Sequence, residues 1–212
     1  MKTAVAQTEE FVYTQAAPLF LSARSAVRFA VTREGSAPSP LASLMVDAKT
    51  GSRDLAGLDG AAQAGMIMNI LGALGPLAVA TLVADVAPRT MPCSCRRPCC
   101  CGEMANALWR NAIDRISQEA ETVTKVTLPY AIRSAIVVKL YSGKKGPDLK
   151  QIADNFHLDR HTVGRYHGEI HRWLRGAKAH KNAEAVEGVE PNAWRDAETS
   201  LRNHGIVADE IV

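Results

Sequence analysis

Five cysteines fall within nine consecutive positions of this chain, and the chain has no others. They are Cys93, Cys95, Cys99, Cys100 and Cys101, in the segment MPCSCRRPCCCGE. Cysteine thiolates are preferred ligands of structural zinc, and the neighbouring Arg96 and Arg97 would offset their negative charge. A zinc site is therefore the first chemistry that the sequence suggests.

The spacing of the cysteines leaves other interpretations open. Four ligands from so short a segment require a tight loop, in which one cysteine is spare or a histidine from elsewhere completes the site. Reduced thiols that pack as small apolar side chains are an alternative. An iron–sulfur or redox role is another, although cluster motifs use longer spacings. Disulfides are disfavoured, because adjacent cysteines rarely have bridgeable geometry and no export signal is apparent.

A second group of candidate residues is basic and fits the chemistry of DNA. One side of a predicted helix carries Arg160, His161, Gly164, Arg165 and His167. Arginine and histidine side chains can reach base edges, and a glycine would allow close approach to DNA or to a neighbouring helix. Cations that flank this helix would lie where phosphates run: Lys144, Lys145, Lys150, Arg172 and Arg175.

Residues 148–176 have the pattern of two helices and a turn that would position these side chains. Apolar residues share one face of each helix: Leu149, Ile152, Ala153 and Phe156, then Val163, Tyr166, Ile170 and Trp173 or Leu174. Ala153 is small enough for a close crossing, Leu158 fills the turn, and Asp159 is placed to cap the second helix. A helix-turn-helix is predicted. The alternative is an ordinary helical hairpin with a solvated basic face.

The same segment resembles region four of bacterial sigma factors and related phage regulators. The residues that carry the likeness are Leu149, Ile152, Ala153, Phe156, Leu158, Arg160, Val163, Arg172, Leu174 and Arg175, preceded by the helix RSAIVVKLYSG at 133–143. The resemblance covers residues 128–176 and implies a major-groove helix at 160–175. Regions for the −10 promoter element have no counterpart here, so the resemblance does not imply a promoter-opening sigma factor.

A weaker resemblance links the chain to phage late-gene regulators of the antitermination (Q-type) class. It rests on the uncharged helix at 62–71, the cysteine cluster at 93–101 and the late helix-turn-helix. It implies a small helical protein that binds double-stranded DNA and acts on bacterial RNA polymerase in the cytoplasm of the host cell. The late-gene role would be antitermination or activation.

The composition of the 212 residues favours an all-α fold. Apolar residues make up 47% of the chain and aromatic residues only 5%, and its many alanines and leucines enter helices at little cost. Helices are expected at about 17–33, 60–73, 76–86, 103–120, 128–142 and 191–204, besides the two in 148–176. The stretch 60–84 has no charge, but Gln63, Asn69 and Gly75-Pro76 favour two short buried helices over a membrane span.

The charge is unevenly distributed along the chain, which the sequence divides into four expected segments. Residues 88–182 hold 17 Lys and Arg against 8 Asp and Glu, an excess that suits a polyanion. The segments are a helical region at 1–90 that is the candidate polymerase or dimer surface, the cysteine-rich loop at 91–102, the DNA-binding region at 103–176, and a linker with a last helix at 177–212. The prediction is one multi-helix domain with a helix-turn-helix in its C-terminal half.

No catalytic set is recognisable in the sequence. Glu119 and Glu121 have no partner base, and His167 and His171 with Glu169 between them fit no protease pattern. An acidic cluster that would hold Mg²⁺ is not seen. We therefore expect a DNA-binding transcription regulator and not an enzyme. The alternative is a structural or adaptor protein whose helix-turn-helix makes protein contacts.

Overall fold

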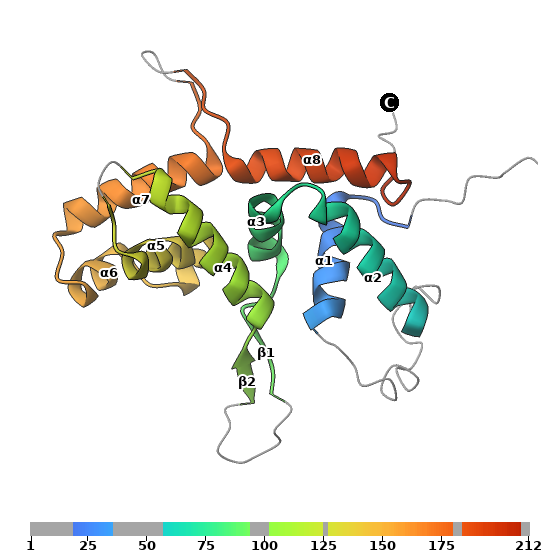
Figure 1. Ribbon diagram of the computed structural model, residues 1–212. Helices are drawn as coiled ribbons and strands as arrows, with labels where there is room; N and C mark the ends of the chain where they lie inside the picture. The colour runs from blue at the N-terminus through green and yellow to red at the C-terminus, as the bar shows by residue number, and fades with distance from the viewer. Residues whose placement is uncertain (1–18, 36–56, 94–101, 125–126, 180–183, 209–212) are drawn as a thin grey trace, which may run out of the picture.

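The computed structural model describes residues 19–35, 57–93, 102–124, 127–179 and 184–208. Their helices, in chain order, are α1 Ala23–Gly35, α2 Gly57–Gly72, α3 Pro76–Val86, α4 Ala107–Glu119, α5 Tyr130–Ser142, α6 Leu149–Asn155, α7 Arg160–Arg175 and α8 Val189–Asn203. Short 3₁₀ turns follow α4 and α5, and a two-stranded sheet precedes α4 (Figure 1). The predicted all-α class is confirmed, apart from this small sheet.

The uncharged stretch folds as two short helices. Gly75, with a φ of 92°, turns the chain between α2 and α3, and Pro76 begins α3 at a position where its missing N–H is not needed. α2 buries Ile67 and Leu71. None of the helices in the described ranges has the length and apolarity required to cross a bilayer.

The helix expected from residue 17 begins only at Ala23. Ser22 and Ser25 bond to each other's backbone and side chains at its start. Before it, Phe20 pairs with the chain that follows α8, because its N–H donates to Ile206 O at 3.1 Å and its carbonyl accepts from Ala208 N at 3.0 Å. The two ends of the described chain are thereby joined.

The sheet is a short antiparallel ribbon that the sequence did not predict. β1 (Thr90–Pro92) pairs with β2 (Glu103–Ala105), and Cys93 N–H donates to Gly102 O at 2.8 Å. The prediction that a helix begins at Glu103 is therefore wrong. α4 begins at Ala107, after Asn106 accepts from Leu108 N at 3.0 Å as its N-cap. Strands of three residues are too short to show the alternation of apolar and polar residues by which a strand is recognised in a sequence.

The apolar spacing of α5 predicts that Ala131, Ala135, Val138 and Tyr141 face inward, and the structure buries a different set. Ala131 is exposed, whereas Ile132, Ile136 and Val137 are buried. α5 contacts α4 on one side and α6 and α7 on others, so it buries a wider surface than a single stripe. Arg133 is buried as well, with its Nε donating to Ser117 O at 3.0 Å and its Nη2 pairing with Glu121 at 3.0 Å.

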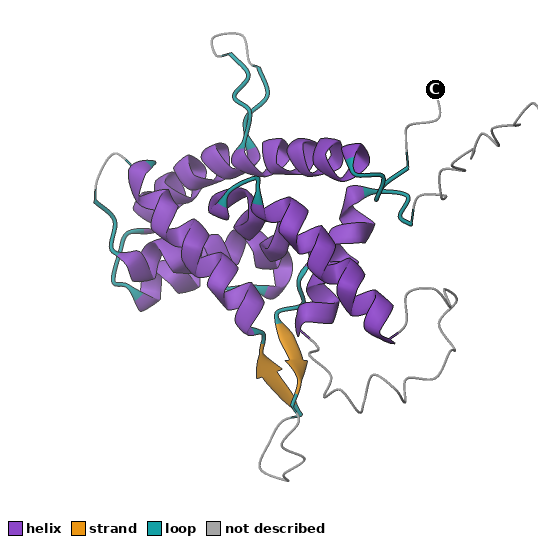
Figure 2. Cartoon of the chain, turned by 45° about the vertical axis from the view of Figure 1, so that its right-hand side comes forward, coloured by secondary structure: helices purple, strands orange, loops and turns teal. Residues whose placement is uncertain are grey.

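A main hydrophobic core joins all the described helices except α6. It includes buried residues from α1 to α4, from α5, from the inward face of α7 and from α8. α8 lies along one side of the molecule and contacts α1, α2, α3 and α7 (Figure 1). The helices of the expected segments 1–90 and 103–176 therefore share a core, and the ribbon projects from it (Figure 2).

Candidate nucleic-acid interface

α6 and α7 are held in place by caps that the sequence encodes locally. Asp148 accepts from Gln151 N at 2.7 Å while Gln151 Oε1 accepts from Asp148 N at 3.0 Å, a capping box at the start of α6. The predicted cap of α7 is confirmed, since Asp159 accepts from Thr162 N at 3.1 Å. Between the helices His157 adopts a φ of 52°, and Leu158 N–H donates to Ala153 O at 2.9 Å.

The inward faces of α6 and α7 pack as the sequence predicted. Ile152, Ala153 and Val163 form a buried cluster, against which Leu149, Phe156 and Leu158 pack. Farther along α7, Tyr166, Ile170 and Leu174 enter the main core. The two helices are thus fixed to each other and to the rest of the protein, which fixes the orientation of the remaining face of α7.

The opposite face of α7 is open and basic in its first two turns. Arg160, His161 and Arg165 are exposed, and Gly164 lies between them. A Cβ at Gly164 would meet no atom within 4 Å, so packing against a neighbouring helix does not explain this glycine. Arg165 extends over the ring of Tyr166 at 5.3 Å, a contact that restrains its guanidinium beside this face.

His167 lies two turns beyond Arg160 on α7 but is less exposed than Arg160, His161 and Arg165. It is half-buried, and its ring stacks on that of His171 with a centroid separation of 6.0 Å. Burial lowers the pKa of His167, and the nearby His171 and Lys139 lower that pKa further. The lowered pKa favours the neutral form of this ring at pH 7.

The flanking cations fall into two groups. Lys145, Lys150 and Arg172 are exposed, and Lys144 lies in the same 3₁₀ turn as Lys145. Arg175 is different, because it forms an ion pair with Glu190 of α8, and its guanidinium lies 5.4 Å from the centroid of the Tyr141 ring. Glu190 is 5% exposed. Arg175 therefore links α7 to the protein interior, and its charge is already paired within the fold.

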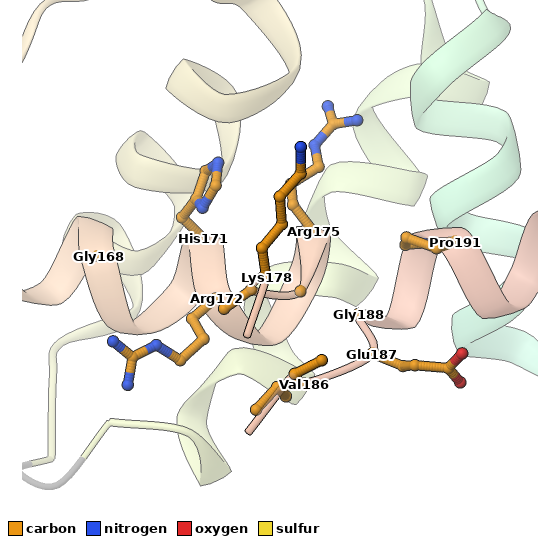
Figure 3. Close-up of a pocket in the computed structure, with 12 residues that line it drawn as sticks. Gly168, His171, Arg172, Arg175, Lys178, Val186, Glu187, Gly188 and Pro191 are labelled. Carbon is orange, nitrogen blue, oxygen red and sulfur yellow. The ribbon is translucent and has the colours of Figure 1, made fainter. Parts of the chain in front are cut away.

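Sequence reasoning missed a basic groove beside α7. The sequence predicts a polar linker at 177–190, but the described residues 176–179 and 184–188 form an arm in which Ala177 and Val186 exchange backbone hydrogen bonds of 2.8 and 2.9 Å. An open groove of about 730 Å³ separates the arm from the C-terminal half of α7 (Figure 3). The signal in the sequence was the pair Gly176 and Gly188, which bracket the arm.

The cysteine cluster is described only at its first member. Cys93 is half-buried at the end of β1, while Cys95, Cys99, Cys100 and Cys101 lie outside the described residues. Within the described ranges, His, Cys, Asp and Glu side chains do not gather in groups of three or more that would hold a metal ion. The zinc interpretation therefore stays a prediction.

No protein-family model, curated protein sequence or solved structure matches this chain.

Proposed function

We propose that this chain is a sequence-specific, double-stranded DNA-binding transcription regulator in which α6 and α7 act as a helix-turn-helix. The observation that carries the proposal is the outward face of α7, where Arg160, His161 and Arg165 are exposed on a helix whose opposite face is buried. A helix of about 10–12 Å diameter fits the major groove, which is about 12 Å wide.

The charges around α7 support binding to a polyanion. Lys145 and Lys150 lie before and within α6, and Arg172 lies farther along α7. In such an arrangement, phosphate contacts fix the orientation of the protein while the side chains at the start of α7 read bases. Arginine at these positions favours guanine, because its two donors match the O6 and N7 acceptors.

The proposed setting is late-gene control in a phage-infected bacterial cell. The protein would bind near a promoter and contact RNA polymerase in the host cytoplasm, as an antiterminator or an activator. The helices α1 to α3, which pack together away from α6, provide the candidate polymerase or dimer surface. This part of the proposal rests on the resemblance to Q-type regulators.

Selection from a random duplex DNA pool at physiological salt tests the function, with sequencing of the retained fraction. We expect enrichment of a defined motif. Arg160→Ala and Arg165→Ala should each weaken binding to that motif by about 1–3 kcal/mol and relax the base preference at one position. Arg28→Ala, an exposed arginine on α1, is the matched control and should bind like the wild type.

Equal binding by the wild type and both α7 variants would contradict the proposal. Salt dependence separates DNA binding from the adaptor alternative. Contacts with several phosphates make affinity fall steeply with salt, whereas a protein contact through an apolar face does not show that dependence.

We also propose that the cysteine loop holds zinc. The geometry at its base fits a closed metal loop, because β1 pairs with β2 and Cys93 N–H donates to Gly102 O at 2.8 Å. The two ends of the cysteine-bearing segment are thereby adjacent. Zinc held by thiolates from this segment would stabilise a loop that is too short to have its own core.

Replacing Cys95 or Cys99 by serine should release zinc and lower the thermal midpoint, because removing a thiolate breaks the coordination that orders the loop. Elemental analysis and thermal unfolding measure both effects, and treatment of the wild type with a chelator should reproduce them. Absence of zinc from the purified wild type, or full metal content in both variants, would remove this proposal.

A further inference from the structure

The arm, residues 176–179 and 184–188, has a closely packed base. Gly176 ends α7 with a φ of 80°, a conformation that favours glycine. A Cβ at Gly188 would lie 2.3 Å from Gly176 N, and a Cβ at Gly176 would lie 2.5 Å from Val186 O. The two backbones touch where only glycine fits. Together with the paired Ala177 and Val186, this contact sets the direction in which the arm leaves α7.

The groove between the arm and α7 is flanked by basic side chains. Its lining includes Gly168, His171 and Arg172 from α7 and Lys178 from the arm. In Figure 3, His171 and Lys178 project on one side of the α7 ribbon and Arg172 on the other. The surface of α7 between them is therefore bordered by positive or titratable groups on both sides.

Two other charged residues of the groove are already neutralised. Glu187 pairs with Arg195 of α8 at 2.7 Å, and this partner lowers the pKa of Glu187. Arg175 pairs with Glu190. Among the described residues, neither Arg172 nor Lys178 has an ion-pair partner, so the charge that the groove offers to a ligand is positive.

The groove continues the outward face of α7. Gly168 is exposed one turn beyond Gly164 on the same side of the helix, and a Cβ there would also meet nothing within 4 Å. From His161 to Arg172 the helix rises about 16 Å, which exceeds the major-groove width of about 12 Å. When the first turns of α7 lie among the bases, its last turns reach the edge of the DNA major groove, where the phosphates run.

We infer that the arm and the C-terminal half of α7 form a phosphate clamp, in which Arg172 and Lys178 hold the DNA backbone that flanks the bases read by the first turns of α7. The inference rests on the proposed DNA-binding function and adds a second contact site to it. Gly164 and Gly168 contribute no side chains to the surface between the two sites, and a Cβ at either would meet no atom within 4 Å, so a duplex can approach this part of α7 closely.

The double variant Arg172→Gln/Lys178→Gln tests the clamp against the selected duplex. We expect affinity to fall by about 30-fold at 0.15 M salt and the slope of log K against log salt to decrease by about 2, because each lost phosphate contact removes about 0.9 from that slope. The base preference should be unchanged, since phosphate contacts carry no sequence information. In an ethylation-interference assay of the variant, ethylation of the flanking phosphates should no longer weaken binding, whereas ethylation of the central phosphates should still weaken it.

Arg28→Gln/Arg110→Gln is the matched control. It removes two exposed positive charges from α1 and α4 and should keep the wild-type slope and interference pattern. Thermal unfolding of each variant checks that the fold is intact, which we expect because the four side chains are exposed.

The outcomes distinguish the clamp from the function on which it rests. If the wild type binds DNA and the clamp variant binds with the same affinity and slope, the clamp is overturned and the DNA-binding function stands. An equal loss in the control pair would also overturn it, because the effect would then be general charge. The clamp would also be overturned if the Arg172→Gln/Lys178→Gln variant lost affinity for single-stranded RNA but kept its affinity for the DNA duplex. If the wild type binds no DNA, both proposals fail.

Discussion

Replacing Arg175 by methionine lowers the free energy of unfolding at pH 7 by about 3–5 kcal/mol, the cost of leaving one partner of a buried ion pair alone. Arg175 pairs with Glu190, whose side chain is 6% exposed. Without the guanidinium, the Glu190 carboxylate stays in the interior of the protein near Asp85. For a chain of this size, the thermal midpoint should fall by about 10 °C.

The loss should depend on pH in a definite direction. Burial already raises the pKa of Glu190 above its usual 4.5, Arg175 lowers it and Asp85 raises it. Removing Arg175 therefore raises this pKa further. A carboxyl whose pKa is higher in the folded state than in the unfolded state contributes its full stability below the unfolded-state pKa. That contribution to the free energy of unfolding is lost as pH rises through the folded-state pKa. The variant should thus approach the wild type near pH 4 and fall increasingly below it toward pH 7.

Two comparisons make this prediction specific. Arg175→Met/Glu190→Leu removes both charges and should recover most of the stability, because no buried charge remains unpaired. Arg195→Met breaks the exposed Arg195–Glu187 pair, whose side chains are 60% and 61% exposed, and should leave the midpoint unchanged within error. A wild-type midpoint for Arg175→Met at pH 7 would show that the pair does not join α7 to α8.

Trp109→Ala is the second substitution with a large expected effect, a loss of about 3–5 kcal/mol in the free energy of unfolding. Trp109 is 8% exposed on α4 and lies in the main core. Its Nε1–H donates to Ala84 O at 3.2 Å. Ala84 belongs to the last turn of α3, where carbonyl groups have no partner within the helix. The indole thus fills the α3–α4 contact and caps α3 at once.

Trp109→Phe separates these two contributions. The phenyl ring keeps most of the packing but cannot donate to Ala84 O, so we expect a smaller loss of about 1–3 kcal/mol, the cost of an unsatisfied buried carbonyl. Equilibrium denaturant unfolding measures both variants. Equal losses for the two variants would show that the hydrogen bond dominates, and no loss for Trp109→Ala would contradict the described α3–α4 contact.

Much of the candidate site was predictable because its determinants are local. Asp159 caps α7 through a residue three positions away, and the apolar spacing of Ile152, Ala153 and Val163 places these side chains between α6 and α7. The division of the uncharged stretch into α2 and α3 follows from Gly75 and Pro76 at the start of α3. Such signals act within one or two turns, so they can be read without knowledge of the rest of the fold.

The failed predictions have the opposite character. The start of α4 was misplaced because β2 exists only through its pairing with β1, across the cysteine segment. The inward face of α5 was misjudged at Ala131 because α5 packs against several helices rather than one. In both cases the deciding contact comes from residues that are distant in the sequence.

The helical class, the N-cap of α7 and the row of basic residues along α7 follow from local signals, since periodicity and capping depend on near neighbours. Which of these basic residues can meet a ligand depends instead on contacts between distant segments. The tertiary structure pairs Arg175 with Glu190, places His167 beside Lys139, and brings Lys178 across a groove from Arg172. A charge is available to a ligand only where the fold provides no partner, and partners are set by packing between distant segments.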